Sequence, residues 1–394
     1  MRLASLMVVA LLAAPVAANA TLCPRGVVFN DLDGDGRRGA AEPGVAGVAV
    51  SDGRRIVRSA ASGEYSLPAA PGSTVFVIKP AGWRVATGGD GLPAFWRNLP
   101  PGQPPLLRFG GITESSTACR DFALVRDPRA PGTLRALVLG DPQPRTATEV
   151  GYYERSIVQG MLDRYAAPSA AGAGPLYLAA KAGHLGLTLG DVVHDDLSLY
   201  PAMNRATARL GLPWLHVAGN HDLDFDAARD EDSLLSFRNT YGPDTFAWEE
   251  HEASFIALDN VVYQPGRQPD YVGGLREDQF AFLAAYLPTL PRDRRLVLAA
   301  HIPFFEPRPG RESFRPRDRE RLFALLADFP NVLLLTAHGH EQRHHLHDAA
   351  TGWRGATLLH EYNLGAACGA FWSGVKDASG VPVGTMADGT PRGP

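Results

Sequence analysis

The chain has 394 residues, of which 45% are hydrophobic and 20% are charged, a composition typical of globular proteins and not of disordered ones. Its 38 basic and 42 acidic residues give a formal net charge of −4, and no basic run stands out. The composition therefore gives no indication of nucleic acid or an anionic membrane as the main partner. The length predicts two or three domains.

The first twenty residues have the pattern of a secretory signal peptide. A charged start at Arg2 precedes an apolar block at 3–16, and Ala18-Asn19-Ala20 matches an A-x-A cleavage site. The block is too short for a stable transmembrane segment, and no other segment is long enough to cross a bilayer. We expect residues 1–20 to be removed and the mature protein to be exported, periplasmic or secreted. A buried N-terminal helix is the alternative.

Residues 21–126 are predicted to form a small all-β sandwich. Short alternating segments at 26–29, 45–50, 56–58 and 75–79 are separated by Gly, Pro, Asp and Ser turns, with no long helical period. Cys23 and Cys119 would close this domain if they paired in an oxidising compartment. Their spacing leaves free thiols as the alternative, because pairing does not follow from spacing alone.

An acidic loop lies within this β region. Asp31, Asp33 and Asp35 alternate before Gly36, and Glu42 stands at the twelfth position, which is the D-x-D-x-D-G…E spacing of a calcium loop. An EF-hand needs flanking helices, whereas the flanking segments here are predicted strands. The loop therefore resembles the calcium-binding turn of bacterial cell-surface β-sandwich repeats. We expect a structural calcium ion, with an exposed acidic hairpin as the alternative.

Residues 133–352 are predicted to form an α/β domain behind a Pro- and Arg-rich linker. Apolar runs of strand length end in polar residues six times, at 134–139, 185–189, 214–218, 255–258, 296–300 and 332–337. Helical stretches lie between them at 149–165, 279–287 and 317–329. Such alternation predicts a layered domain whose ligands bind beyond the carboxyl ends of the strands. Residues 353–394 become Gly-rich and are expected to form a partial C-terminal β region.

Six potential metal ligands follow these apolar runs directly or nearly so. They are Asp141, Asp191, Asn220, His301, His338 and His340. Histidine is the commonest neutral metal ligand, and carboxylates beside it suit a divalent or trivalent ion. Six oxygen and nitrogen donors at one sheet edge are enough to hold two ions, which can clamp a phosphate and generate hydroxide at neutral pH.

Five sequence blocks resemble the ordered signature D-x-H, G-D, G-N-H-D/E, H and G-H-x-H of the calcineurin-like metallophosphoesterases. The blocks are Gly140-Asp141-Pro142-Gln143, Gly190-Asp191, Gly219-Asn220-His221-Asp222, Ala300-His301-Ile302-Pro303 and His338-Gly339-His340. They keep the family's order over about two hundred residues. Segments 45–53, 63–65 and 369–394 resemble the extra N- and C-terminal domains of a bacterial exported branch. The resemblance implies a four-layer α/β/β/α phosphoesterase domain behind the β-sandwich.

The resemblance also assigns the ligands of two ions, with manganese, zinc, iron or magnesium as the candidates. The first ion is held by Asp141 and His340, Asp191 bridges both ions, and the second ion is completed by Asn220, His301 and His338. Gln143 stands where the family usually has histidine. The first ion would therefore have a neutral oxygen donor there or would lose that ligand.

The implied reaction is hydrolysis of a phosphate monoester or diester. His221 would protonate the leaving oxygen with Asp222 holding its ring, while a metal-bound hydroxide attacks phosphorus in line. Close behind Asp191, two assignments stay open: His194 facing the phosphate pocket, or Asp195 capping the next helix. Tyr263 and Tyr271 lie in or near the loops expected to form the pocket walls, where they either stack on a substrate ring or simply pack.

The rival interpretations come from other classes of protein. An exported binding or attachment protein with a non-catalytic phosphoesterase-like domain is the alternative function. A zinc peptidase would need H-E-x-x-H on a helix, and the one match, His340 to His344, lies in a segment with strand-period alternation. No ligand role is assigned to His344, His345 or His347. The expected partner is a phosphate-ester substrate, and no oligomeric state is predicted.

Overall fold

The computed structural model describes residues 22–166, 185–308, 310 and 313–392. The signal peptide predicted at residues 1–20 lies outside the described residues. Within the described ranges, no helix has the length and apolar character needed to cross a membrane.

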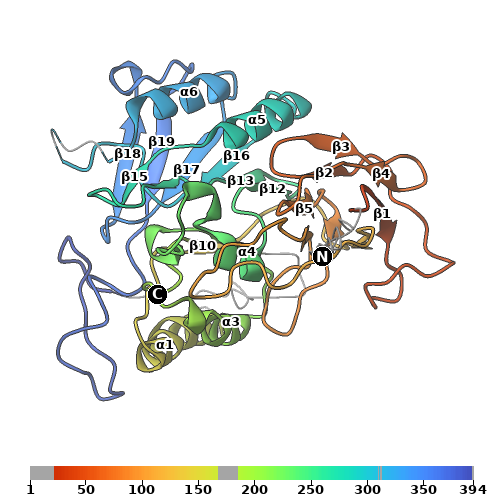
Figure 1. Ribbon diagram of the computed structural model, residues 1–394. Helices are drawn as coiled ribbons and strands as arrows, with labels where there is room; N and C mark the ends of the chain where they lie inside the picture. Colours follow the sequence, from red (N-terminus) through yellow and green to blue (C-terminus); the bar gives the residue numbers. More distant parts are fainter. Residues whose placement is uncertain (1–21, 167–184, 309, 311–312, 393–394) are drawn as a thin grey trace, which may run out of the picture.

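The N-terminal region forms a β-sandwich of two four-stranded sheets, as predicted (Figure 1). The first sheet has the order β4 (Glu64–Ser66), β1 (Arg25–Asn30), β8 (Phe122–Arg126) and β6 (Trp83–Arg84). The second has the order β3 (Ile56–Arg58), β2 (Ala49–Ser51), β5 (Thr74–Val77) and β7 (Trp96–Asn98). A disulfide joins Cys23, just before β1, to Cys119, just before β8. The pairing that spacing left open is therefore present.

Two further sheets form the α/β domain. The smaller is wholly parallel, in the order β11 (Trp214–Val217), β10 (Leu185–Leu189) and β9 (Ala136–Leu139). The larger has the order β12 (Phe246–Glu249), β13 (Ser254–Ala257), β16 (Leu296–Ala299), β17 (Val332–Thr336), β19 (Leu359–Asn363) and β18 (Arg343–His347). A hairpin of β14 (Val261–Tyr263) and β15 (Tyr271–Gly273) projects beside it.

Helices cover the two outer faces of these sheets and give the predicted four-layer order. On the side of the smaller sheet are α1 (Ala147–Tyr153), a π-helical turn (Glu154–Val158), α2 (Gln159–Ala166), α3 (Tyr200–Ala208) and α4 (Leu235–Tyr241). On the side of the larger sheet are α5 (Glu277–Tyr286) and α6 (Pro316–Leu326) (Figure 1). Short 3-10 turns occur at Leu197–Leu199, Asn220–Asp222, Asp230–Asp232, Leu287–Thr289 and Ala349–Thr351.

The larger sheet of the α/β domain continues past residue 352, the boundary predicted from the sequence. Strand β19 pairs parallel with β17 and antiparallel with β18, so it lies inside the larger sheet. Its alternating burial, with Leu359 and Glu361 inside, supplies a strand signal that the Gly-rich surroundings obscured. From residue 364 the described chain has only isolated bridges, and one of them, between Gly140 and Ala366, attaches it to the end of β9.

The β-sandwich packs directly on the α/β domain through a buried ion network. Lys79 forms an isolated bridge with Trp248, and its Nζ lies 2.7 Å from Oε1 of Glu250. Arg129, from the predicted linker, lies 3.0 Å from Oε2 of Glu250 and 2.7 Å from Oε1 of Glu252. The linker arginine thus shares Glu250 with Lys79 of the β-sandwich.

Candidate active site

The predicted ligands lie at strand ends in an unusual backbone conformation. The non-glycine residues with positive φ in the described ranges are Asp141, Gln143, Asp191, Asp195, His338 and His340, with φ between 39° and 66°. A left-handed conformation costs an L-residue roughly 1–2 kcal/mol and persists where the surroundings enforce it. All six positions fall at this one edge, so the fold concentrates backbone strain where the sequence predicts the chemistry.

Two glycines of the sequence blocks allow these strand ends to approach one another. A Cβ atom on Gly219 would lie 2.2 Å from Oδ1 of Asp191, and one on Gly190 would lie 2.5 Å from Nδ1 of His301. Real Cβ atoms do not tolerate such distances, so only glycine fits at either position. The close packing of the backbone around the ligands therefore requires the glycines of the G-D and G-N-H-D blocks.

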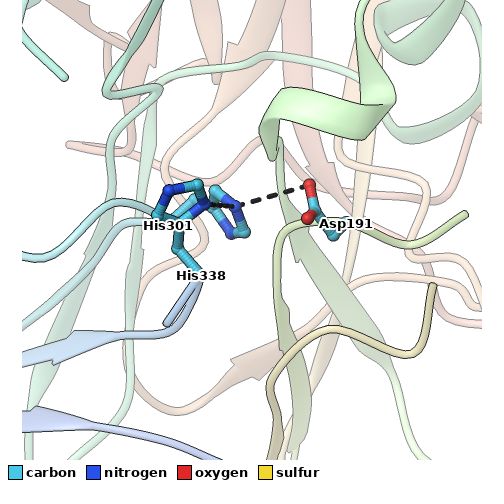
Figure 2. A group of neighbouring side chains, drawn as sticks. All are labelled: Asp191, His301 and His338. Atoms are coloured by element: carbon cyan, nitrogen blue, oxygen red, sulfur yellow. Dashed lines mark hydrogen bonds and ion pairs between the residues drawn. The ribbon is translucent and has the colours of Figure 1, made fainter. Parts of the chain in front are cut away.

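Three side chains from other strand ends converge on His301, and two of them are drawn with it in Figure 2. Its Nε2 is 3.0 Å from Oδ1 of Asn220 and 3.1 Å from Nδ1 of His338. Oδ1 of Asp191 lies 3.4 Å from the same nitrogen. Nδ1 of His301 donates to the carbonyl of Leu189 (2.8 Å), which leaves Nε2 as an acceptor.

This convergence of acceptors fits a cation. Lone pairs so close together repel unless a cation or a proton lies between them. Ligands at about 2.1 Å from an octahedral ion are about 3.0 Å apart, which matches the spacing around His301. Burial lowers the pKa of His301 well below its ordinary value and that of His338 to about 4, so both rings are neutral, as metal ligands must be.

The predicted first-ion residues surround a buried carboxylate oxygen. Oδ1 of Asp141 has no hydrogen-bond partner among the described residues, and the side chain is fully buried. Nε2 of His340 lies 3.8 Å from it, while Nδ1 of His340 is 2.8 Å from the carbonyl of Gly369. That contact turns Nε2 of His340 toward Asp141. An orphaned carboxylate oxygen facing a histidine nitrogen is what a cation would satisfy.

Gln143 belongs to the same cluster, but its oxygen faces elsewhere. Its Nε2 donates to Oδ2 of Asp191 (3.2 Å), while its Oε1 lies 3.7 Å from Sγ of Cys368. In this rotamer the first ion would have no ligand from Gln143. Exchanging the amide oxygen and nitrogen by a flip would present an oxygen donor instead.

His221 lies beside the ligand cluster, and its ring is held by Asp195, not by Asp222. Nδ1 of His221 is 2.7 Å from Oδ1 of Asp195. Burial opposes protonation, but this hydrogen bond and the carboxylates of Asp191 and Asp222 raise the pKa of His221 to about 9. A protonated imidazole of this kind has the character of a general acid.

The predicted role of Asp222 was therefore wrong. Its buried carboxylate accepts hydrogen bonds from Gly219 N–H (2.9 Å), Val192 N–H (3.1 Å) and the Tyr200 hydroxyl (3.0 Å). These contacts join the loop that carries Asp191 to the loop that carries Asn220. They also occupy the carboxylate oxygens of Asp222, so neither is left to accept from His221. A helix-capping Asp195 was one of the two alternatives left open, and in the structure Asp196 caps the following turn by accepting from Ser198 N–H.

His194 and the C-terminal segment line the site in ways the motif did not reveal. The ring of His194 stacks on that of His221, with centroids 4.0 Å apart. Phe371 lies 6.1 Å from His194 and 5.4 Å from His340, ring centroid to ring centroid. Trp372 anchors this segment by donating from Nε1 to the carbonyl of Pro142 (2.7 Å). Sequence periodicity could not predict that Phe371, much further along the chain, packs against His194.

The two predicted pocket tyrosines have different surroundings. The ring of Tyr271 lies 6.1 Å from that of His338, nearly perpendicular, so it borders the ligand cluster. Tyr263 is buried, and its hydroxyl donates to the carbonyl of Phe225 (2.6 Å), which is a packing role. An open cavity of about 510 Å³ between this tyrosine and Asp195 includes Arg267 and Asp270 in its walls.

The other histidines of the C-terminal strands lie away from the ligands, where no role was assigned. His347 is fully buried against Glu361 (2.7 Å), and His345 stacks on Phe305. His344 stacks on Tyr362.

In the N-terminal loop, ligand atoms of Asp31, Asp33 and Glu42 lie within 4.8 Å of one another. Asp35 is outside this group and accepts from Arg37 N–H (2.7 Å).

Comparison with known protein families identifies the core of the chain. The family model "Calcineurin-like phosphoesterase" matches residues 135–342, more than half of the 394 residues. The chain belongs to this family. Models for the "N terminal of Calcineurin-like phosphoesterase" and the "C terminal of Calcineurin-like phosphoesterase" match residues 33–108 and 361–394. The resemblance stated from the motifs is therefore confirmed, including both flanking regions.

Solved structures also resemble the chain, at low sequence identity. The purple acid phosphatase PPD1 isolated from yellow lupin (Lupinus luteus) seeds matches 84% of this chain with a TM-score of 0.43 and 11% identity. The chain spans 58% of the length of that phosphatase. A dimetal phosphatase from Danio rerio matches 60% of this chain and 88% of its own, with a TM-score of 0.38 and 14% identity. No curated protein sequence matches the chain.

Proposed function

We propose that this calcineurin-like phosphoesterase hydrolyses phosphate esters with two metal ions at the edge between its two sheets. The observation that carries the proposal is the meeting of Asn220, His338 and Asp191 around Nε2 of His301, at 3.0–3.4 Å. These residues and Asp141, His340 and, after an amide flip, Gln143 would hold the ions. When bound, two such ions supply a nucleophile at neutral pH and neutralise charge on the phosphoryl oxygens.

The protein's own groups complete the reaction. Asp191 contacts both His301 and Gln143, so its carboxylate would be the ligand that the two ions share. His221, protonated through its hydrogen bond to Asp195, donates its proton to the leaving oxygen as the phosphorus–oxygen bond breaks. The buried carboxylate of Asp222 keeps the G-D and G-N-H-D loops in register, so the acid stays at a fixed distance from the cluster.

The test is hydrolysis of 4-nitrophenyl phosphate and bis(4-nitrophenyl) phosphate by residues 21–394. The protein is stripped with chelator and restored separately with manganese, zinc, iron or magnesium, with Asn220→Ala beside it. We expect metal-dependent turnover that Asn220→Ala reduces together with the bound metal, and the preferred ester separates monoesterase from diesterase. A folded protein that binds metal but hydrolyses neither ester contradicts the proposal.

We propose that the protein is exported through the signal peptide at residues 1–20. The disulfide between Cys23 and Cys119 supports this, because such bonds persist in oxidising compartments. N-terminal sequencing of protein expressed with its leader tests the idea. We expect the mature chain to begin at Thr21, and a retained Met1 would contradict cleavage.

We also propose that the loop at residues 31–42 binds a structural calcium ion. The proximity of Asp31, Asp33 and Glu42 supports it. In the metal-free loop, Oδ1 of Asp31 accepts from Gly34 N–H and Oε1 of Glu42 accepts from Leu32 N–H, which preforms the turn. Calcium should raise the unfolding temperature of the wild-type chain and not that of Glu42→Gln. An equal response of both chains would contradict the site.

A further inference from the structure

An arginine beside the general acid has no part in the reaction described above. Arg145 lies two residues after Gln143 and directly before Thr146, the N-cap of α1. Its backbone N–H donates to Oε2 of Glu149 (2.6 Å), so the backbone is fixed at this point. Among the described residues, no carboxylate lies within ion-pair distance, 4.0 Å, of its exposed guanidinium. Asp195 is close enough to interact with the charge of Arg145 at longer range, but no carboxylate of the described residues pairs with the guanidinium directly.

The guanidinium is held in place by an aromatic ring. Cζ of Arg145 lies 4.3 Å from the ring centroid of Phe371, a cation–π contact that positions the charge without neutralising it. Phe371 is 39% exposed, unusual for so large an apolar ring, and its neighbour Trp372 is buried and hydrogen-bonded to Pro142. An anchored and partly exposed ring beneath an unpaired arginine is a binding surface and not part of the core.

Two histidines that contact Phe371 show where this surface lies relative to the reacting groups. Phe371 meets the edge of His194, which stacks on His221, the proton donor to the leaving group. On its other side Phe371 approaches His340 of the first-ion set. Arg145 thus lies on the side of the cluster where His221 would protonate the leaving group. An anion bound by Arg145 would belong to that leaving group.

We propose that Arg145, supported by Phe371, binds a second phosphate group carried by the leaving-group portion of the substrate, which makes the enzyme selective for bisphosphorylated compounds. This inference rests on the proposed function, because it concerns the substrate of the same site. A guanidinium binds phosphate through two parallel N–H···O bonds, whereas a lysine ammonium acts as a point charge. The subsite therefore needs arginine at this position and not only a positive charge.

The test compares fructose 6-phosphate with fructose 1,6-bisphosphate as probes, which differ by the second phosphate. In Arg145→Ala, the KM for the bisphosphate divided by the KM for the monophosphate should rise about tenfold, as expected for a charge-assisted bidentate contact. Arg145→Lys and Phe371→Leu should each raise the ratio less. Arg155→Ala is the matched control, because Arg155 is an exposed arginine over another ring, Tyr152. It should leave the ratio at its wild-type value.

Binding measured without turnover separates this proposal from the proposed function. Calorimetric titration of both sugars into metal-loaded His221→Gln, with and without Arg145→Ala, gives the affinity directly. We expect tighter binding of the bisphosphate, lost on removal of Arg145. If neither sugar nor any chromogenic ester is hydrolysed but this preference is present, the proposed function fails and the subsite stands. Equal affinities in both chains, or equal KM ratios in Arg145→Ala and wild type, overturn the subsite even where turnover is normal.

Discussion

Buried carboxylates occur in two regions of this molecule and are compensated in different ways. At the interface between the β-sandwich and the α/β domain, Glu250 and Glu252 are matched by Lys79 and Arg129 at 2.7–3.0 Å. At the edge between the two sheets of the α/β domain, Asp141, Asp191 and Asp222 are buried, as Glu250 is, whereas Glu252 is only partly buried. Among the described residues, none of these three aspartates has a lysine or arginine within 4.0 Å.

The pKa values show what this difference means. Burial opposes ionisation of Glu252, but hydrogen bonds from Arg129 and Gly132 N–H lower its pKa to about 2. Burial raises the pKa of Asp141 and of Asp191 to about 7, and hydrogen bonds and the charge of His221 offset this effect only in part. At the interface each carboxylate has a cationic partner, whereas the carboxylates of the active site outnumber its one protonated histidine, His221. Bound metal ions would supply the missing positive charge, so the excess of buried carboxylates is itself evidence for a metal site.

The largest expected effect comes from removing the carboxylate between the two proposed ion positions. Asp191→Asn should lower kcat on the order of a thousandfold, because metal catalysis supplies several kcal/mol and each 1.4 kcal/mol is about tenfold in rate. Bound metal, measured by mass spectrometry after dialysis, should fall in parallel. An Asp191→Asn chain that keeps both its metal and its turnover would show that the active-site carboxylates are not compensated by metal ions.

At the interface, removing a carboxylate should lower stability and leave activity unchanged. In Glu250→Gln, the buried positive charges of Lys79 and Arg129 lose their shared partner. Breaking a buried pair typically costs about 3–5 kcal/mol of unfolding free energy. Turnover per folded molecule should stay at the wild-type level, since no interface group reaches the histidines. Urea unfolding and kinetics on the same samples measure both quantities.

An exposed ion pair provides the control for the interface prediction. Arg229 and Asp232 are 2.7 Å apart, with 64% of the arginine side chain exposed. Arg229→Ala should leave stability unchanged, because exposed pairs contribute little. A loss as large as that of Glu250→Gln would mean that burial does not decide the energetics.

The active-site carboxylates should also make the metal-free protein sensitive to pH. Their folded-state pKa of about 7 lies above the ordinary value of about 3.9, so between pH 4 and 7 the folded state holds more protons than the unfolded state. Unfolding free energy must then fall as pH rises through this window, by about 1–3 kcal/mol. Urea unfolding of chelator-treated protein at pH 5 and pH 7.5 measures the fall. It should be smaller in Asp141→Asn/Asp191→Asn, and an equal fall in both chains would assign it to other groups.

The ligand positions could be predicted from the sequence because each depends on a local pattern. An apolar run that ends in a polar residue fixes where a strand stops, and parallel strands bring their carboxyl ends to one edge. Asp141, Asp191, Asn220, His301 and His338 follow that rule. The glycines before Asp191 and Asn220 could be recognised from the same blocks, since they stand where strand ends meet.

The partners of those ligands could not be predicted, because they depend on packing between distant segments. Asp195 and Asp222 are both acidic and close to the histidine in sequence or space. Asp195, at a left-handed turn, reaches His221, whereas Asp222 is held by the N–H groups of Gly219 and Val192. The carbonyl of Gly369 turns His340 toward Asp141 from a segment with no strand or helix period. Strand β19 was missed for a related reason: its sequence Leu359–Asn363 is largely polar, and its pairing partners decide its structure.

The smallest expected effect concerns Glu252, where compensation by arginine should be visible as a pH dependence of opposite sign. Its folded-state pKa of about 2 lies below its ordinary value of 4.5, so its stabilising effect is present above pH 4.5 and is lost as pH falls toward 2. Glu252→Gln should lower the unfolding free energy by about 1 kcal/mol at pH 7, since the pair is only partly screened by solvent.

At pH 3 the difference between Glu252→Gln and wild type should shrink to less than half, as urea unfolding at the two pH values would show. The metal-free active site loses stability as pH rises, and this interface loses it as pH falls. A constant difference for Glu252→Gln across the range would mean that Arg129 acts through packing and not through its charge. The contrast between the two regions would then rest on the active-site carboxylates alone.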